Sequence, residues 1–169
     1  MVPVTPKGKA RSHALLGCYS NFTFLKGASH PDEMVATAAA LGWSTIGIAD
    51  VNSLAGIVRA HVAARDHHIR LLVGARLRPV DGPDVLVHPC DREGYEGLSM
   101  LLSEANMRGS KAAPVLYLAD LARLPESTVL LAMPPRHPDA CYQAHLDKIL
   151  QIAKGQIFAG ICLYRDGAD

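Results

Sequence analysis

The sequence has few aromatic residues, little net charge and no closely spaced cysteines. Phe, Trp and Tyr make up 5% of the 169 residues, and the formal net charge at pH 7 is +1. A near-neutral chain has no general electrostatic attraction to phosphate backbones, so we expect weak or no independent nucleic-acid binding. The four cysteines are scattered without a C-x-x-C pair, which argues against a zinc finger and against a dithiol redox motif.

Long apolar runs and the common nucleotide and nucleophile motifs are missing as well. No segment approaches the roughly 18 apolar residues that cross a bilayer, and the first residues lack the apolar core of a secretory signal. We therefore expect a cytoplasmic protein without membrane contact. The sequence contains neither phosphate-loop motif, G-x-x-x-x-G-K-[ST] or G-x-G-x-x-G, and no G-x-S-x-G nucleophile elbow.

The length predicts one domain with a real apolar core, preceded by a tail. Residues 1–12 are rich in Pro, Gly and Lys and predict a flexible tail. Its basic residues Lys7, Lys9 and Arg11 fit a solvated tail or an arm that touches phosphate. Residues 13–169 are then predicted to form a single, partial domain.

Apolar periodicity and capping residues predict strands and helices in alternation. Strands are predicted at residues 15–18, 43–49, 69–77, 85–88, 129–133 and 157–163. Helices are predicted to begin at Pro31, at Ser53 as a cap, at Asp91 as a cap and at Pro138. Such alternation predicts an α/β fold with right-handed βαβ units and a parallel sheet.

Three segments, residues 20–33, 54–64 and 91–98, resemble the PHP (polymerase and histidinol phosphatase) domain. The likeness is to the N-terminal PHP domain of bacterial error-prone DNA polymerases, C-family alpha subunits of DNA polymerase III, and it runs from about residue 15 to 163. It implies alternating βα units of a distorted β7α7 barrel, expected to be incomplete here. Family members carry polymerase modules after this domain, so the chain is expected to be a truncated form that cannot polymerise DNA alone.

The resemblance also implies five metal-ligand positions at the ends of the first three strands. The family has a His-x-His pair, an Asp-His pair and a Glu there, whereas this sequence has Gly17, Tyr19, Asp50, Val51 and Arg76. Asp50 alone keeps a metal-binding group, and Arg76 puts a permanent cation where an anionic ligand is expected. The resemblance thus implies a degenerate metal site. Arg76 either replaces the metal as the counter-charge of Asp50 or lies exposed at a strand end.

Other residues offer alternative metal ligands. His137, Cys141 and His145 recur every four residues and would form a stripe on one helix, although Pro138 leaves His137 at the cap. His88 lies near the end of a predicted strand. No cofactor is expected, and if one is bound it should be a divalent ion, Mn, Zn or Mg.

Two functions of different classes follow from the resemblance. In the first, the chain is a non-catalytic PHP module of an error-prone, translesion polymerase that contacts the polymerase core or other replication and repair proteins. The alternative is a metal-dependent phosphoesterase or 3′–5′ exonuclease, as intact PHP domains can be, and the ligand set discriminates the two. A third possibility is an independent binding protein, because open barrel edges favour self-association.

Overall fold

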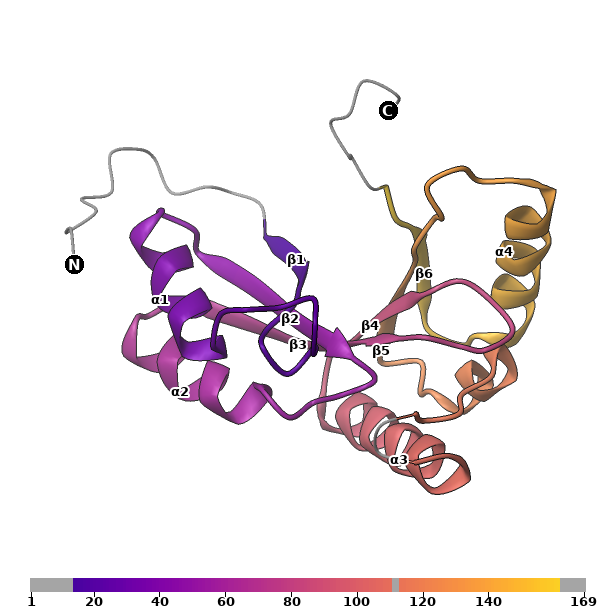
Figure 1. The fold of residues 1–169 in the computed structure, drawn as a ribbon, viewed down its shortest axis with the longest axis horizontal. Coiled ribbons are helices and arrows are strands. Elements are labelled where there is room, and N and C mark those ends of the chain that lie inside the picture. The colour runs from indigo at the N-terminus through magenta and orange to yellow at the C-terminus, as the bar shows by residue number, and fades with distance from the viewer. Residues whose placement is uncertain (1–13, 111–112, 162–169) are drawn as a thin grey trace. The chain divides into compact units, whose positions relative to one another are not determined.

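The computed structural model describes residues 14–110 and 113–161, and the chain divides into two compact units, Met1–Arg76 and Leu77–Asp169 (Figure 1). The predicted tail, residues 1–12, and the end of the last predicted strand lie outside the described residues. No helix in the described part of the chain is long and apolar enough to cross a membrane.

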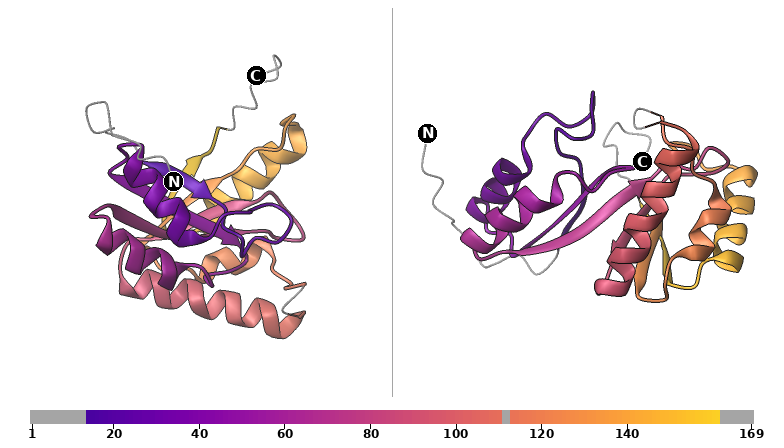
Figure 2. Two further views of the ribbon diagram at one scale, coloured as in Figure 1. Left: turned by 60° about the vertical axis from the view of Figure 1, so that its left-hand side comes forward. Right: turned by 90° about the horizontal axis from the view of Figure 1, so that it is seen from below.

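The first unit is a three-stranded parallel sheet with two helices on one face. The strands are β1 (Leu15–Cys18), β2 (Thr45–Val51) and β3 (Arg70–Leu77, whose last residue falls in the second unit). Helices α1 (Pro31–Ala40) and α2 (Ile57–Asp66) connect them and lie side by side in the views of Figures 1 and 2. Strand β2 pairs in parallel with both β1 and β3, which confirms the predicted βαβ units in this region.

The core of the first unit shows which way each residue of β2 points. Ile46 and Ile48 are buried with residues of both helices, among them Val35 and Ala60. Because side chains alternate along a strand, Asp50 points to this same helix-covered face. Val51, the next residue, points to the opposite face.

The second unit combines three strands with helices α3 (Arg92–Arg108) and α4 (Ala140–Ile152) and the 3-10 helix η1 (Leu118–Arg123). Strand β4 (Val85–Pro89) runs antiparallel to β5 (Thr128–Ala132), and β5 is parallel to β6 (Gln156–Ala159). The predicted all-parallel sheet is therefore wrong at β4. Residues 90–127, between β4 and β5, contain α3 and η1, and a connection of this length permits either strand direction, so alternation of strand and helix does not by itself fix a parallel pair.

All four predicted helix starts can be compared with the structure. Helix α1 begins at Pro31 as predicted, whereas α4 begins at Ala140 with Asp139 as its cap, so the predicted start at Pro138 is wrong. Asp91 caps α3 as predicted, and its carboxylate accepts a hydrogen bond from the Gly94 amide at 2.9 Å. Ser53 does not cap α2, which begins at Ile57 after Gly56. The Ser53 hydroxyl instead accepts from the Ala55 amide at 3.1 Å, a local turn that competes with helix formation.

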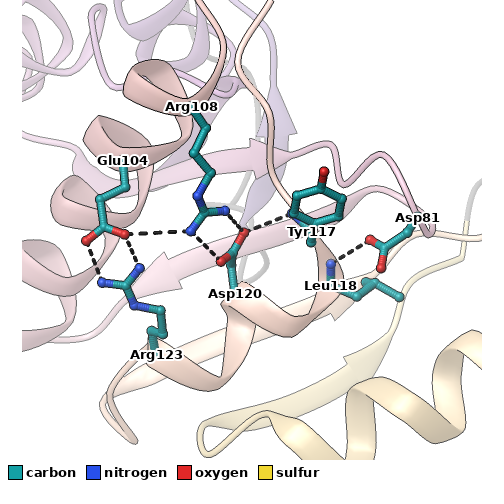
Figure 3. A network of polar contacts seen from close by, with 7 residues as sticks. All are labelled: Asp81, Glu104, Arg108, Tyr117, Leu118, Asp120 and Arg123. Carbon is teal, nitrogen blue, oxygen red and sulfur yellow. Dashed lines mark hydrogen bonds and ion pairs between the residues drawn. The ribbon is translucent and has the colours of Figure 1, made fainter.

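A charged network fixes η1 against α3 in the second unit (Figure 3). Asp120 of η1 accepts two hydrogen bonds from Arg108, at 2.5 and 2.8 Å, and one from the Tyr117 amide at 2.9 Å. The Arg108 guanidinium holds the pKa of Asp120 below its usual value. Glu104 pairs with Arg123, which likewise lowers the pKa of the glutamate. Helix and 3-10 turn are thus joined by complementary charges.

Candidate functional site at the ends of the first strands

Asp50, at the carboxyl end of β2, is 1% exposed and accepts three hydrogen bonds. Its Oδ1 accepts from the Ser20 amide at 2.8 Å and from the Thr23 hydroxyl at 2.6 Å, and its Oδ2 accepts from the Ser20 hydroxyl at 2.7 Å. A buried carboxylate needs such donors, because leaving it unpaired in an apolar environment is costly. Neutral hydroxyl and amide groups therefore satisfy this carboxylate.

The loop of residues 20–27 is built around this carboxylate. Thr23 also accepts a hydrogen bond from the Val51 amide at 3.1 Å, so one hydroxyl bridges the loop and the strand. The Thr23 carbonyl accepts from the amides of Lys26 and Gly27, which closes the turn. A Cβ at Gly27 would lie 1.9 Å from the Ser20 carbonyl oxygen, so only glycine fits. The loop is fixed from both ends.

This loop presents two large apolar side chains to solvent. Phe24 is 84% exposed and Leu25 is 90% exposed. Leu25 has a φ of 64°, a left-handed conformation that is uncommon for residues other than glycine. The loop thus combines an anchored backbone with two exposed apolar side chains.

Arg76 and Tyr19 lie on the other face of the sheet from Asp50. In the β2–β3 register Val51 pairs with Arg76, while Asp50 pairs with Ala75. Arg76 donates a hydrogen bond to the Tyr19 hydroxyl, and its guanidinium carbon is 5.0 Å from the centre of the Tyr19 ring. The expectation that Arg76 serves as counter-charge of Asp50 is therefore wrong, because neighbouring positions of a strand point to opposite faces.

Gly17, the first expected ligand position, supplies no ligand, and the residue after it is Cys18. Gly17 has a φ of 69°, and the β1–β2 register is irregular between Leu15 and Cys18. Burial raises the pKa of the Cys18 thiol, so the thiol is protonated near neutral pH. With glycine, a phenol, valine and a guanidinium at four expected positions, the residues present do not fit a divalent metal ion.

The alternative metal ligands do not converge either. Asp139 is the N-cap of α4, so His137 precedes the helix, and only Cys141 and His145 share a face, with 3.9 Å between Sγ and Nδ1. His88 is 8% exposed and lies in β4, in the second unit. Within residues 14–110 and 113–161 no group of three or more His, Cys, Asp or Glu side chains could hold a metal ion.

Sequence reasoning missed the groups that satisfy Asp50. It assigned no role to the hydroxyls of Ser20 and Thr23, which donate to the carboxylate. The available signal was the Ser-x-x-Thr spacing directly after a strand, since hydroxyl residues at that spacing close turns and cap buried acceptors.

Known proteins resemble this chain along most of its length. The PHP domain model matches residues 16–166. An error-prone DNA polymerase from Rhodopseudomonas palustris is 41% identical over 95% of this chain, and one from Caulobacter vibrioides is 41% identical over 85%. The error-prone DNA polymerase 2 of Agrobacterium fabrum is 40% identical over 91%. The chain spans 13–15% of the length of these relatives.

Two solved structures share the fold at low sequence identity. One is assigned as a metal-dependent phosphoesterase from Bifidobacterium adolescentis, with a TM-score of 0.66, 16% identity, and coverage of 88% of this chain and 78% of the other. The second is an amidohydrolase from Chromobacterium violaceum with bound sulfate and no metal, with a TM-score of 0.66, 13% identity, and coverage of 85% and 75%. Family match, relatives and fold agree, and this chain belongs to the PHP domain family.

Proposed function

We propose that this chain is a non-catalytic PHP module of an error-prone DNA polymerase, acting in the cytoplasm in replication and repair. The observation that carries the proposal is the way in which the protein satisfies the Asp50 carboxylate. Its carboxylate is buried and takes three hydrogen bonds from the loop that follows β1. The positions where a phosphoesterase of this family would bind metal hold Gly17, Tyr19, Val51 and Arg76.

The proposed task is to support the polymerase core and to contact it or other repair proteins. The error-prone polymerases that resemble this chain are about seven times longer, so their matching region is one module among several. The exposed pair Phe24 and Leu25 on the anchored loop supports a contact with an apolar pocket on such a partner. Ordering this loop in advance lowers the entropy cost of binding.

Turnover measurements separate this proposal from the enzymatic alternative, a metal-dependent phosphoesterase or 3′–5′ exonuclease. Protein purified without chelator is incubated with Mn, Zn or Mg and assayed on a phosphomonoester, a phosphodiester and single-stranded DNA. We expect no turnover above a buffer control. Metal-dependent turnover that co-purifies with the chain, and is lost in Asp50→Asn, would favour the enzyme.

A variant designed to bind metal tests why the wild-type chain is proposed not to bind it. The triple variant Tyr19→His, Val51→His and Arg76→Glu places three metal-binding groups on the face opposite Asp50. We expect it to bind Zn or Mn, whereas Arg76→Glu alone should not, because one carboxylate does not complete a coordination sphere. Gly17 stays unchanged, since its φ of 69° disfavours a side chain. Metal binding by the single variant would identify the Arg76 cation as the main obstacle.

Self-association is the remaining partner hypothesis, because unpaired strand edges favour pairing with a second copy. Size-exclusion chromatography with light scattering reports the mass in solution directly. A dimer that Phe24→Ser does not dissociate would indicate pairing through strand edges. A monomer at all concentrations would leave contact through the loop as the proposed mode.

A further inference from the structure

A groove lies between helices α1 and α2 on the surface of the first unit. It has a volume of about 610 Å³, and residues of both helices line it. Its apolar lining includes Val58 and Val62, which lie one turn apart on α2 and are 73% and 45% exposed. Ala36 of α1 and Ala63 of α2 extend this lining. Exposed valines beside a hollow of this size form a candidate docking surface.

The charges that line the groove are mainly negative. Asp32 and Glu33 lie in the first turn of α1, and Asp66 is the last residue of α2. Arg59 is the one lysine or arginine among the described residues of the lining. With His67 counted as neutral, these three acids and one arginine give the groove a formal net charge of −2. A segment that combines apolar side chains with cations complements such a surface.

Residues 1–13 have this complementary composition. Their cations are Lys7, Lys9 and Arg11, three of the 17 Lys and Arg residues of the chain, and they include none of its 16 Asp and Glu residues. The rest of the chain is therefore net negative, although the whole chain is +1. Two valines and two prolines precede Lys7. Proline favours an extended backbone, a conformation in which short segments occupy grooves.

The tail joins the fold at the end of the sheet where α2 ends. In the register of the parallel strands Leu15 pairs with Ile46, and Ile46 pairs with Leu71. Asp66 lies five residues before Leu71, so the beginning of β1 and the end of α2 lie at the same end of the sheet. Thirteen extended residues span about 45 Å, whereas the ten residues of α2 span about 15 Å. The tail is therefore long enough to follow the whole groove.

We propose that residues 1–13 dock in the groove between α1 and α2 of the same chain. The tail valines then cover Val58 and Val62, and the tail cations face the acids of the groove. Surface ion pairs contribute little alone, so burial of the exposed valines supplies the apolar part of the contact. Because the tail is attached to the fold, its effective concentration is in the millimolar range and weak contacts suffice. This contact is separate from the proposed partner contact of the 20–27 loop.

Methyl NMR of the whole chain tests this docking. We expect nuclear Overhauser contacts between methyl groups of Val2 or Val4 and those of Val58 or Val62. Contacts within one chain should not change between about 20 and 500 µM protein, and should weaken as salt is raised to about 0.5 M. Contacts that grow with protein concentration would overturn the proposal and identify a second copy as the occupant.

Variants in the tail and in the groove measure the two parts of the contact. The triple variant Lys7→Glu, Lys9→Glu and Arg11→Glu should lower the ratio of docked to free tail about tenfold. Val58→Ser should lower it about threefold. Val80→Ser, the same change at a 63% exposed valine of the second unit, is the matched control and should leave the ratio unchanged. No contacts in the wild-type chain, or contacts of equal strength in the triple variant, would overturn the proposal.

Discussion

Two buried carboxylates, Asp50 in the first unit and Asp120 in the second, are satisfied in different ways. Asp120 accepts two hydrogen bonds from the Arg108 guanidinium, so its charge is balanced by a cation. Asp50 accepts three hydrogen bonds from an amide and two hydroxyls. Each carboxylate holds one segment in place. Asp50 fixes the 20–27 loop against β2, and Asp120 fixes η1 against α3.

Asp50 occupies a position where the family resemblance implies a metal ligand, and here its carboxylate accepts hydrogen bonds from Ser20 and Thr23. Asp50 serves the same structural purpose as Asp120, and the local arginine is directed elsewhere. Arg108 donates hydrogen bonds to the Asp120 carboxylate, whereas Arg76 contacts the hydroxyl and ring of Tyr19. We infer that the first unit keeps Asp50 on the helix-covered face of its sheet to hold the 20–27 loop, and places the Arg76 cation on the opposite face.

The largest expected effect is on the Asp50 anchor. Asp50→Ala leaves the Ser20 amide and two hydroxyls buried without their acceptor, and we expect the free energy of unfolding to fall by about 3 kcal/mol or more. The single tryptophan, Trp43, lies in the first unit, so urea unfolding followed by its fluorescence reports this region. Asp66→Ala, at an exposed position at the end of α2, is the control and should change the free energy by less than about 0.5 kcal/mol.

Thr23→Val removes one hydroxyl while keeping the side-chain shape, so it isolates a part of the same anchor. The variant loses the hydrogen bond to Asp50 and the acceptor of the Val51 amide. We expect a loss of about 1 to 2 kcal/mol in the same unfolding experiment. Thr37→Val, at an exposed position of α1, provides the matched control. Equal effects at both threonines would contradict the bridging role of the Thr23 hydroxyl.

The ion pair between Asp120 and Arg108 in the second unit is expected to contribute less stability than the Asp50 hydrogen bonds, and to lose its contribution in acid. Arg108→Met removes the cation from Asp120, and the Tyr117 amide, which donates to that carboxylate, reports the change through hydrogen exchange. We expect its protection factor to fall about threefold at neutral pH, because this pair is partly solvated. Arg92→Met, which removes an exposed pair with Glu96 on α3, should not alter it.

The difference in Tyr117 amide protection between wild type and Arg108→Met should depend on pH, because the pKa of Asp120 is lowered in the folded protein. A carboxyl group whose folded-state pKa is depressed stabilises the fold above its unfolded value, about 3.9, and this contribution is lost as the pH falls through the folded-state pKa. The protection factors of wild type and Arg108→Met should therefore converge in acid. A difference that stays constant down to about pH 2 would show that Arg108 acts through packing.

The smallest expected effect on stability comes from the loop surface. Phe24 is 84% exposed, so Phe24→Ser should change the free energy of unfolding by less than about 0.5 kcal/mol. It should nevertheless weaken binding to the Rhodopseudomonas palustris polymerase from which the matching N-terminal region has been removed, measured with this chain as the added partner. Unchanged binding would exclude the loop from that contact.

Much of the first unit could be predicted from the sequence because its signals are local. Proline and two carboxylates mark the start of α1, and a short apolar run ending in Asp50 marks β2. The antiparallel pairing of β4 and β5 could not be predicted in this way, because strand direction depends on the length and path of connections.

The candidate site was harder to predict because it depends on contacts across the fold. The identities of the residues at the expected ligand positions are visible in the sequence. Their orientation is not, since it depends on the β2–β3 register, which separates Asp50 from Arg76. The hydroxyls that satisfy Asp50 lie 27 and 30 positions earlier in the chain, and only the folded loop brings them to the carboxylate.

The most direct test of the central claim is the metal content of the wild-type chain after purification without chelator and dialysis against Mn and Zn, measured by inductively coupled plasma mass spectrometry. The account predicts no bound Mn or Zn above the level in an equal volume of dialysis buffer. Near-stoichiometric metal that disappears in Asp50→Asn would contradict it, because the carboxylate would then be a ligand and not the anchor of the 20–27 loop.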